Sequence, residues 1–226
     1  MQGLDDIRET VEEVRADHPK LKAHEAFVAW FCEAYLVGER AKAIECLTGA
    51  PGDMGIDAVY VDHRFGQVHL VQGKYHTSPG TQENAAVRQF AELAADFADP
   101  DAEEHWEKAS APARKKIVAA HKAFHSREYY LAMYFVTTGT VKRDVAEDAR
   151  KVALKAADSF EVLDHNALAQ IHRDWLEAVA PPLPELEMAA VEKTPLQHGG
   201  DSAPLAWVFT TTAAELARLY DLAGDR

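Results

Sequence analysis

"GDMGIDAVYVDHRFGQVHLVQGKYH", residues 52–76, is the stretch that determines the fold of this chain. Apolar and polar residues alternate from Ile56 to Val61 and again from Gln67 to Gly73. This period of two predicts a pair of strands, because successive side chains of a strand point to opposite faces of a sheet. Only a few residues, ending in Gly66, separate the two runs, so we expect the strands to form an antiparallel hairpin.

Polar residues stand at the ends of both expected strands. Asp57 begins the first strand between two apolar residues, and the second strand ends with Gln72, Gly73 and Lys74. Adjacent antiparallel strands bring such side chains within reach of one another. Oxygens of Asp57, of Gln72 and of the Gly73 carbonyl would suit a hard cation such as Mg²⁺. The Lys74 ammonium would then lie beside metal-bound water, where it can deprotonate or orient that water or offset charge on a phosphate.

The composition is that of a globular protein, with 226 residues of which 47% are hydrophobic and 27% charged. This length allows one sizeable core, or one domain and part of a second. No stretch approaches the roughly 20 apolar residues that cross a bilayer, and the acidic N-terminus lacks the apolar core of a signal peptide. We therefore expect a cytoplasmic protein with no membrane partner. Cys32 and Cys46 lie in apolar surroundings without metal-ligand spacing, which predicts a reduced, buried pair.

The formal net charge of −13 argues against non-specific binding to polyanions. Binding is local, however, and basic residues gather between residues 114 and 127 and between 142 and 155. Each group is also compatible with a solvated helix face. The sequence contains neither a phosphate-binding G-x-x-x-x-G-K-[ST] loop nor a G-x-S-x-G nucleophile elbow. The sequence therefore gives no indication of ATP or GTP hydrolysis or of a serine nucleophile.

Apolar residues at helical spacing alternate with short apolar runs along the first 180 residues. The runs predict strands over residues 128–139 and 160–163. Strands separated by helices in this order favour a mixed α/β sheet with crossover connections. We expect helices over residues 4–17, 22–37 with Gly38 at the end, 82–97, 103–124 with an interruption at Pro112, 142–157, and 166–179.

The composition of the sequence changes after residue 180. Pro181, Pro182 and Pro184 form a stiff break, and "LQHGGDSAPL", residues 196–205, is typical of a loop. Residues 206–226 predict a strand followed by a helix that Thr212 caps. Because a strand and one helix cannot bury a core, we expect a chain that is cut short or that exchanges its tail with a partner. Formation of a homo-oligomer stays open.

The hairpin resembles the PD-(D/E)XK phosphodiesterase superfamily, which has the restriction-endonuclease-like fold. Its pattern is an aspartate at the start of one strand, an acidic-x-Lys at the end of the next, and a glutamate on the preceding helix. Gln72 stands at the acidic position, which is the Q-x-K variant. The chain looks most like the N-terminal nuclease region of the AIPR (abortive phage infection) proteins. "FTTTAAELARLYDLAGDR", residues 209–226, is similar to the segment that leads into their longer C-terminal region.

The resemblance implies an α/β fold, with a restriction-endonuclease-like mixed sheet and a central β-hairpin flanked by helices. Residues 1–180 would form the nuclease-like domain, and residues 181–226 a linker and the start of a truncated AIPR-like region. The first strand of the sheet would lie near Ala43–Leu47. The activity implied is that of a hydrolase, a metal-dependent endonuclease that uses Mg²⁺ or Mn²⁺ to cleave DNA or RNA in anti-phage defence. The residues expected to act are Asp57, Gln72, Lys74 and Glu25, with Asp57, Gln72 and Gly73 on the metal.

Several points stay open. Glu33 is an alternative to Glu25 as the helix acid, because it lies nearer the edge of the apolar face of its helix. Asp53 is an outer ligand or simply a turn residue. The residues expected to contact the substrate are Tyr75, His76 and Gln89. The alternative function is a catalytically inactive module that keeps the fold and binds nucleic acid or a partner protein.

Overall fold

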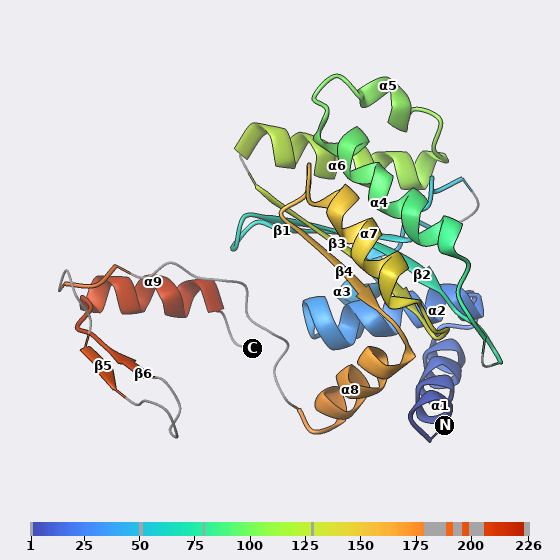
Figure 1. The fold of residues 1–226 in the computed structure, drawn as a ribbon, viewed down its shortest axis with the longest axis horizontal. Helices are drawn as coiled ribbons and strands as arrows, with labels where there is room; N and C mark the ends of the chain where they lie inside the picture. Colours follow the sequence, from blue (N-terminus) through green and yellow to red (C-terminus); the bar gives the residue numbers. More distant parts are fainter. Residues whose placement is uncertain are drawn as a thin grey trace. The chain divides into compact units, whose positions relative to one another are not determined.

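The computed structural model describes residues 2–49, 52–78, 80–127, 129–178, 189–191, 196–198 and 206–223. The chain divides into two compact units, Met1–Pro181 and Pro182–Arg226. The first unit contains a four-stranded sheet flanked by helices, and it carries every residue expected to act in the site (Figure 1). Among the described residues, no helix combines the length and the apolar character needed to cross a membrane.

The sheet has the strand order β1-β2-β3-β4. Strand β1 (Ala58–Asp62) runs antiparallel to β2 (Gln67–Lys74), whereas β3 (Tyr130–Thr137) and β4 (Ser159–Leu163) continue the sheet in parallel. The expected hairpin is confirmed. Its turn is held by Asp62 Oδ1, which accepts hydrogen bonds from the backbone N–H groups of Arg64 at 2.9 Å and Phe65 at 3.3 Å. The mixed α/β sheet predicted from the order of elements is therefore present.

The strand expected near Ala43–Leu47 was wrong, because residues Arg40–Cys46 form helix α3. Ala43 and Cys46 are both buried and lie three residues apart, which places them on one face of a helix. Leu47 alone keeps a strand-like contact, an isolated bridge to Ala58. As a result, the hairpin is not central. β1 forms the edge of the described sheet, and β2 lies inside it.

The other helices of the first unit agree with the sequence pattern within a few residues. The helix expected over 22–37 is an α-helix followed by a π-helix, and Gly38 ends it with φ = 70°. The helix expected over 103–124 is broken before Pro112 into α5 and α6. The bounds are α1 Gln2–Asp17, α2 Ala23–Phe31, η1 Cys32–Val37, α4 Asn84–Ala98, α5 Glu103–Trp106, α6 Ala111–Arg127, α7 Arg143–Ala153 and α8 His165–Leu176.

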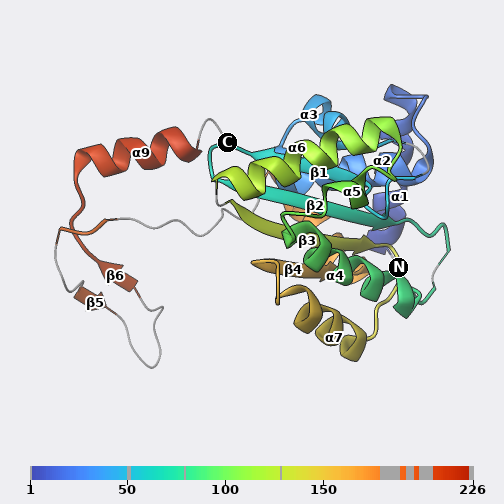
Figure 2. The same ribbon diagram turned by 90° about the horizontal axis from the view of Figure 1, so that it is seen from above.

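A hydrophobic cluster lies on each face of the sheet. One cluster packs Leu70 and Phe135 against α4, α6 and α7. The other packs Val71 and Tyr134 against α1, α2, η1 and α8. Figure 1 shows α4, α5 and α6 above the sheet and α1, α2, α3 and α8 below it, and Figure 2 gives the view from above. The sheet is therefore the middle of three layers.

Where α2 crosses strand β2, the strand has a glycine, Gly73, and therefore no side chain. A Cβ atom on Gly73 would overlap Val28 Cγ2 and would lie 3.5 Å from the ring of Phe27. The missing side chain thus lets α2 pack directly on the backbone of β2. Because Glu25 lies one turn before Val28 on the same helix face, this contact sets the distance of Glu25 from the end of β2.

A histidine pair on α6 and a pair of cysteines have structural roles. On α6, His121 Nε2 lies 2.9 Å from the carbonyl oxygen of Asp99, and His125 Nε2 lies 3.1 Å from the carbonyl oxygen of Phe97. Both histidines therefore bind the C-terminal end of α4. Cys32 and Cys46 are buried free thiols. Burial raises the pKa of both, that of Cys46 to about 11, which keeps them protonated and poor metal ligands.

The second unit contains the hairpin of β5 (Leu196–His198) and β6 (Ala206–Val208), followed by helix α9 (Ala213–Ala223). The strand and helix expected after residue 206 are confirmed. Thr212 Oγ1 accepts a hydrogen bond from Glu215 N at 3.1 Å, so the expected cap is present. The prediction of a loop over residues 196–205 was wrong for residues 196–198, which form β5. Residues 199–205 and the proline break at 181–184 lie outside the described residues.

We predict that Gly73→Ala destabilises the protein, because the added methyl group must displace Val28 and with it α2. Overpacking of a well-packed core costs about 1–3 kcal/mol, to be measured by denaturant unfolding. Gly80→Ala is the matched control, since the nearest atom to a Cβ there is Ser78 O at 4.0 Å. Equal stability of the two variants would show that α2 does not depend on this contact.

Candidate functional site

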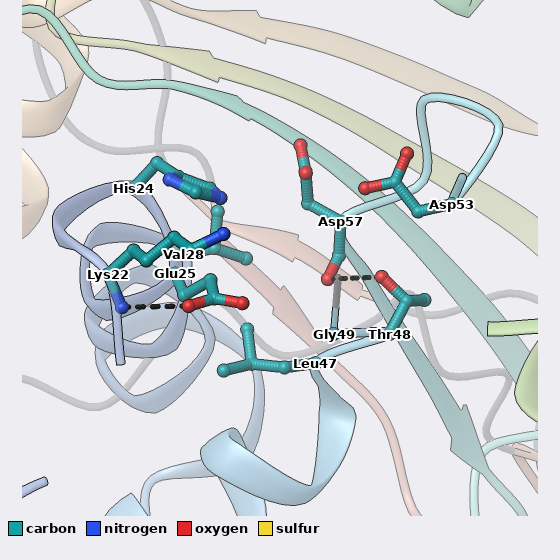
Figure 3. A pocket seen from close by; sticks show the side chains of 9 residues that line it. All are labelled: Lys22, His24, Glu25, Val28, Leu47, Thr48, Gly49, Asp53 and Asp57. Atoms are coloured by element: carbon teal, nitrogen blue, oxygen red, sulfur yellow. Dashed lines mark hydrogen bonds between the residues drawn. The ribbon is translucent and has the colours of Figure 1, made fainter. Parts of the chain in front are cut away.

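A pocket of about 170 Å³ opens between the start of α2 and the loop that leads into β1. Figure 3 shows acidic side chains reaching it from both sides, Glu25 from α2 and Asp53 and Asp57 from the loop. The pocket therefore brings together acids that lie about 30 residues apart in the sequence. Its lining consists of Lys22, His24, Glu25, Val28, Leu47, Thr48, Gly49, Asp53 and Asp57.

Asp57 is held on all sides by the backbone around it. Its carboxylate Oδ2 accepts a hydrogen bond from the N–H of Gly73 at 2.8 Å, and its own N–H donates to the carbonyl of Val71 at 2.8 Å. Its carbonyl oxygen accepts from both the N–H and the hydroxyl of Thr48, each at 2.9 Å. The carboxylate is thus fixed against the end of β2 with little freedom to rotate away.

The environment of Asp57 disfavours its negative charge and raises its pKa to about 7. Burial is the largest cause, and the hydrogen bond from Gly73 N–H acts in the opposite direction. The neighbouring carboxyl group of Asp53 raises the pKa further, and the charge of Lys74 lowers it. Asp57 therefore needs a proton or a positive charge as a partner near neutral pH.

Asp53 belongs to a tight turn. Its Oδ1 accepts a hydrogen bond from the N–H of Gly55 at 2.9 Å, and its carbonyl accepts from the N–H of Ile56 at 3.1 Å. The turn passes through left-handed backbone at Met54, with φ = 59°, and at Gly55, with φ = 83°. Such conformations are rare for residues with a side chain and need support from their surroundings.

The two candidate helix acids have different environments. Glu25 is half-buried and lines the pocket, and its Oε2 accepts a hydrogen bond from the N–H of Lys22 at 2.7 Å. Glu33 lies in the π-helix, is only 12% exposed, and is paired with Arg40. The structure therefore places Glu25 in the pocket that Asp57 also lines, and it pairs Glu33 with Arg40.

The end of β2 lies beside the pocket without lining it. Gln72 is 7% exposed, and its Nε2 would lie 3.0 Å from a Cβ atom on Gly55, so its carboxamide packs against the turn that holds Asp53. Gly73 donates its N–H to Asp57. Lys74 is half-buried, and its charge acts on the Asp57 carboxyl. In the described part of the chain, the Lys74 ammonium makes no ion pair and no hydrogen bond.

The three expected substrate contacts do not line the pocket. Tyr75 packs on Phe27, with ring centroids 5.5 Å apart, on the face of the sheet that α2 covers. His76 Nε2 lies 2.8 Å from Gln82 Oε1, next to Thr138, which accepts a hydrogen bond from the His76 N–H at 2.6 Å. Gln89 is exposed on α4. Contact with a substrate therefore requires that the substrate extend beyond the pocket.

Sequence reasoning did not single out Lys22, His24 and Thr48. Thr48 Oγ1 donates to the carbonyl of Ile56 at 2.7 Å, so it holds the loop that carries the acids. Lys22 and His24 are exposed and place basic groups on the pocket wall beside Glu25. Lys22 and His24 could have been found only because they lie close to Glu25 in the sequence. No sequence pattern pointed to Thr48.

The donors in the pocket are carboxylate oxygens, which hard cations prefer. In the described part of the chain, however, no three histidine, cysteine, aspartate or glutamate side chains are grouped closely enough to hold a metal ion as they stand. Because the Asp57 carboxylate is fixed by Gly73 N–H, a shared ion would require the side chain of Glu25 or Asp53 to turn. The Gln72 oxygen Oε1 is buried without a hydrogen-bond partner among the described residues, although Gln72 does not line the pocket.

No protein-family model, no curated protein and no solved structure matches this chain.

We predict that the protein loses stability as pH rises toward 8 in the absence of divalent metal. The folded protein holds a proton on Asp57 up to about pH 7, whereas the ordinary value is 3.8, so the unfolded state binds fewer protons between these values. Asp57→Asn should remove this loss, because its oxygen still accepts from Gly73 N–H and it carries no charge. We expect the variant to be more stable than the wild type at pH 8 by on the order of 2 kcal/mol.

The measurement is denaturant unfolding between pH 5 and pH 8 in the presence of a chelator. The matched control is Asp148→Asn, which removes the same charge from the exposed face of α7. If the wild type and Asp57→Asn show the same pH dependence, the Asp57 carboxyl is not held protonated by its surroundings.

Proposed function

We propose that this protein is a metal-dependent nuclease that hydrolyses phosphodiester bonds in DNA or RNA. The observation that carries the proposal is the meeting of Asp57 and Glu25 in one pocket at the end of β2, where the charge of Lys74 acts on Asp57. These are the positions at which the PD-(D/E)XK pattern has its strand aspartate, its helix glutamate and its lysine.

The acids of the pocket would hold Mg²⁺ or Mn²⁺. Asp57 and Glu25 supply carboxylate oxygens, and Gln72 and the Gly73 carbonyl are further oxygen donors at the end of β2. When bound, the ion supplies a more acidic water molecule and stabilises charge on the phosphate. The raised pKa of Asp57 supports this role, because a dication in place of the proton would satisfy the buried carboxyl group.

Lys74 would act on the water or on the phosphate. Its half-buried ammonium has no ion pair or hydrogen bond among the described residues, so its charge remains available to a substrate. Lys22 and His24 on the opposite wall of the pocket would attract the phosphate backbone, which supplies most of the affinity for nucleic acids. A local basic wall of this kind is compatible with the net charge of −13.

A role in anti-phage defence rests on the resemblance to AIPR proteins, as does the view that residues 181–226 begin a further region. The rival function is a module of the same fold that binds nucleic acid or a partner protein without cleaving it. Both functions use the same pocket, so an assay of cleavage distinguishes them.

We predict that Lys74→Ala lowers metal-dependent cleavage by about a hundredfold or more and leaves the melting temperature nearly unchanged. The assay uses labelled single- and double-stranded DNA and RNA with Mg²⁺ or Mn²⁺, and a chelator as the blank. If the wild-type protein cleaves none of the four substrates with either metal, the binding module is the better description.

A second pair of variants tests which helix acid serves the site. Glu25→Gln should strongly reduce cleavage but preserve the helix start, because glutamine also accepts a hydrogen bond from Lys22 N–H. Glu33→Gln should leave cleavage by the folded protein unchanged and lower its melting temperature, because it weakens the partially buried pair with Arg40. The opposite result would place Glu33 in the site.

A further inference from the structure

Three polar side chains are buried where strands β2 and β3 end. Thr137 is 0% exposed, Thr138 is 2% exposed, and Gln82, just before α4, is 4% exposed. Buried polar groups destabilise a protein unless they are hydrogen-bonded. All three are bonded, and their bonds lead to two residues, Lys74 and His76. The buried cluster therefore bears on the segment that carries the lysine of the proposed site.

The backbone that follows β2 is held against the end of β3. Thr138 Oγ1 accepts a hydrogen bond from His76 N–H at 2.6 Å and donates one to the His76 carbonyl at 3.1 Å. The Lys74 carbonyl accepts from Thr138 N–H at 3.2 Å, and Thr137 Oγ1 lies 3.0 Å from the same oxygen. The backbone of Lys74 is thus fixed, although Lys74 is the last residue of its strand.

Gln82 connects these bonds to the start of α4. Its N–H donates to the carbonyl of Thr140 at 2.9 Å, which anchors its backbone to the segment after β3. Its Oε1 lies 3.2 Å from Thr137 Oγ1 and 2.8 Å from His76 Nε2. Its Nε2 lies 3.5 Å from the carbonyl oxygen of Glu83, a position that suits the donor end of an amide. The amide oxygen therefore faces the imidazole ring.

This orientation of the amide determines the tautomer of His76. An amide oxygen only accepts hydrogen bonds, so the ring hydrogen lies on Nε2, and Nδ1 of the neutral ring is left as an acceptor. In the part of the chain that the structure describes, Nδ1 has no hydrogen-bond partner. The ring also packs closely on Gly139, where a Cβ atom would lie 3.2 Å from His76 Cδ2. One hydrogen bond and one close contact therefore hold the ring.

His76 and Lys74 lie on the same side of the chain. Gly73 faces α2, so Lys74 faces the opposite side, because neighbouring residues of a strand alternate. Tyr75 packs on an aromatic ring of α2, whereas His76 faces the segment that leads into α4. The alternation thus continues past the end of β2. His76 is therefore a second polar group on the side of Lys74.

We propose that Gln82 is a positioning residue of the nuclease site, which holds His76 in its Nε2–H tautomer and so provides a hydrogen-bond acceptor, Nδ1, on the side of Lys74. This inference rests on the proposed function. The acceptor suits a water molecule and not a phosphate oxygen, because a phosphate oxygen has no hydrogen to donate. His76 thus orients a water molecule, while the charge of Lys74 acts on the phosphate.

The first measurement is the hydrogen bond of the His76 ring in the full chain, by NMR spectroscopy in alkaline buffer. A ring N–H proton is observed only when a hydrogen bond slows its exchange with water. We expect this proton on Nε2 in the wild type and its loss in Gln82→Leu. The matched control is Gln89→Leu, which removes an exposed amide from α4 and should keep the signal.

The second measurement is metal-dependent cleavage of the four nucleic-acid substrates. Gln82→Leu should lower kcat by about tenfold or more and leave KM nearly unchanged, because the variant misplaces an acting group without removing a binding contact. His76→Ala, at a half-buried position, should lower kcat at least as much. Gln89→Leu should cleave like the wild type.

The outcomes separate this inference from the proposed function. If Gln82→Leu loses the ring hydrogen bond, keeps its melting temperature and cleaves like the wild type, the network is only structural, and the inference fails while the proposed function stands. Wild-type cleavage by His76→Ala leads to the same conclusion, even if Gln82→Leu does not fold. A wild-type ring with its hydrogen on Nδ1 also overturns the inference. If the wild type shows the ring hydrogen bond but cleaves no substrate, the proposed function fails, and the role of Gln82 fails with it.

Discussion

The close contact between α2 and the backbone of β2 at Gly73 is the constraint on which the rest of the site depends. Gly73 has no side chain, so Val28 and Phe27 pack directly against the strand. The same residue donates its N–H to the Asp57 carboxylate. One position thus sets both the approach of the helix that carries Glu25 and the orientation of Asp57, the residue just before β1. A larger residue would separate the two halves of the pocket, although each half would keep its own secondary structure.

The loop before β1 supplies the second constraint. Lys116, on α6, donates hydrogen bonds to the carbonyl oxygens of Glu45 and Leu47 and so holds the end of α3. Thr48 then binds the carbonyls of Ile56 and Asp57, which closes the loop on itself. These bonds hold Asp57 at the wall of the pocket, where burial and the nearby charge of Asp53 raise the pKa of Asp57. Strain and repulsion of this kind concentrate at functional sites, where a ligand can relieve them.

Much of the fold could be predicted from the sequence because the local patterns were strong. The alternation in residues 56–73 predicted the β1–β2 hairpin, and Gly38 marked the end of the second helix. The prediction of a strand near Ala43–Leu47 was wrong because it came from a resemblance and not from alternation of apolar and polar residues. Burial of Ala43 and Cys46 on one side is compatible with a helix, and the helix leaves β1 at the edge of the sheet. His121 and His125 had no pattern that connected them with the end of α4, because that contact joins distant segments.

By itself, the sequence determined the hairpin and the polar residues at its strand ends, Asp57, Gln72 and Lys74, because alternating side chains mark two adjacent strands. It favoured Glu25 as the helix acid with Glu33 as the alternative, and it left Asp53 as a ligand or a turn residue. The tertiary structure decided the positions of these three. Glu33 pairs with Arg40, Glu25 lines the pocket, and Asp53 is hydrogen-bonded in its turn and lines the same pocket. The physical reason is that periodicity determines which face a side chain occupies, whereas only packing between distant segments determines what lies opposite that face.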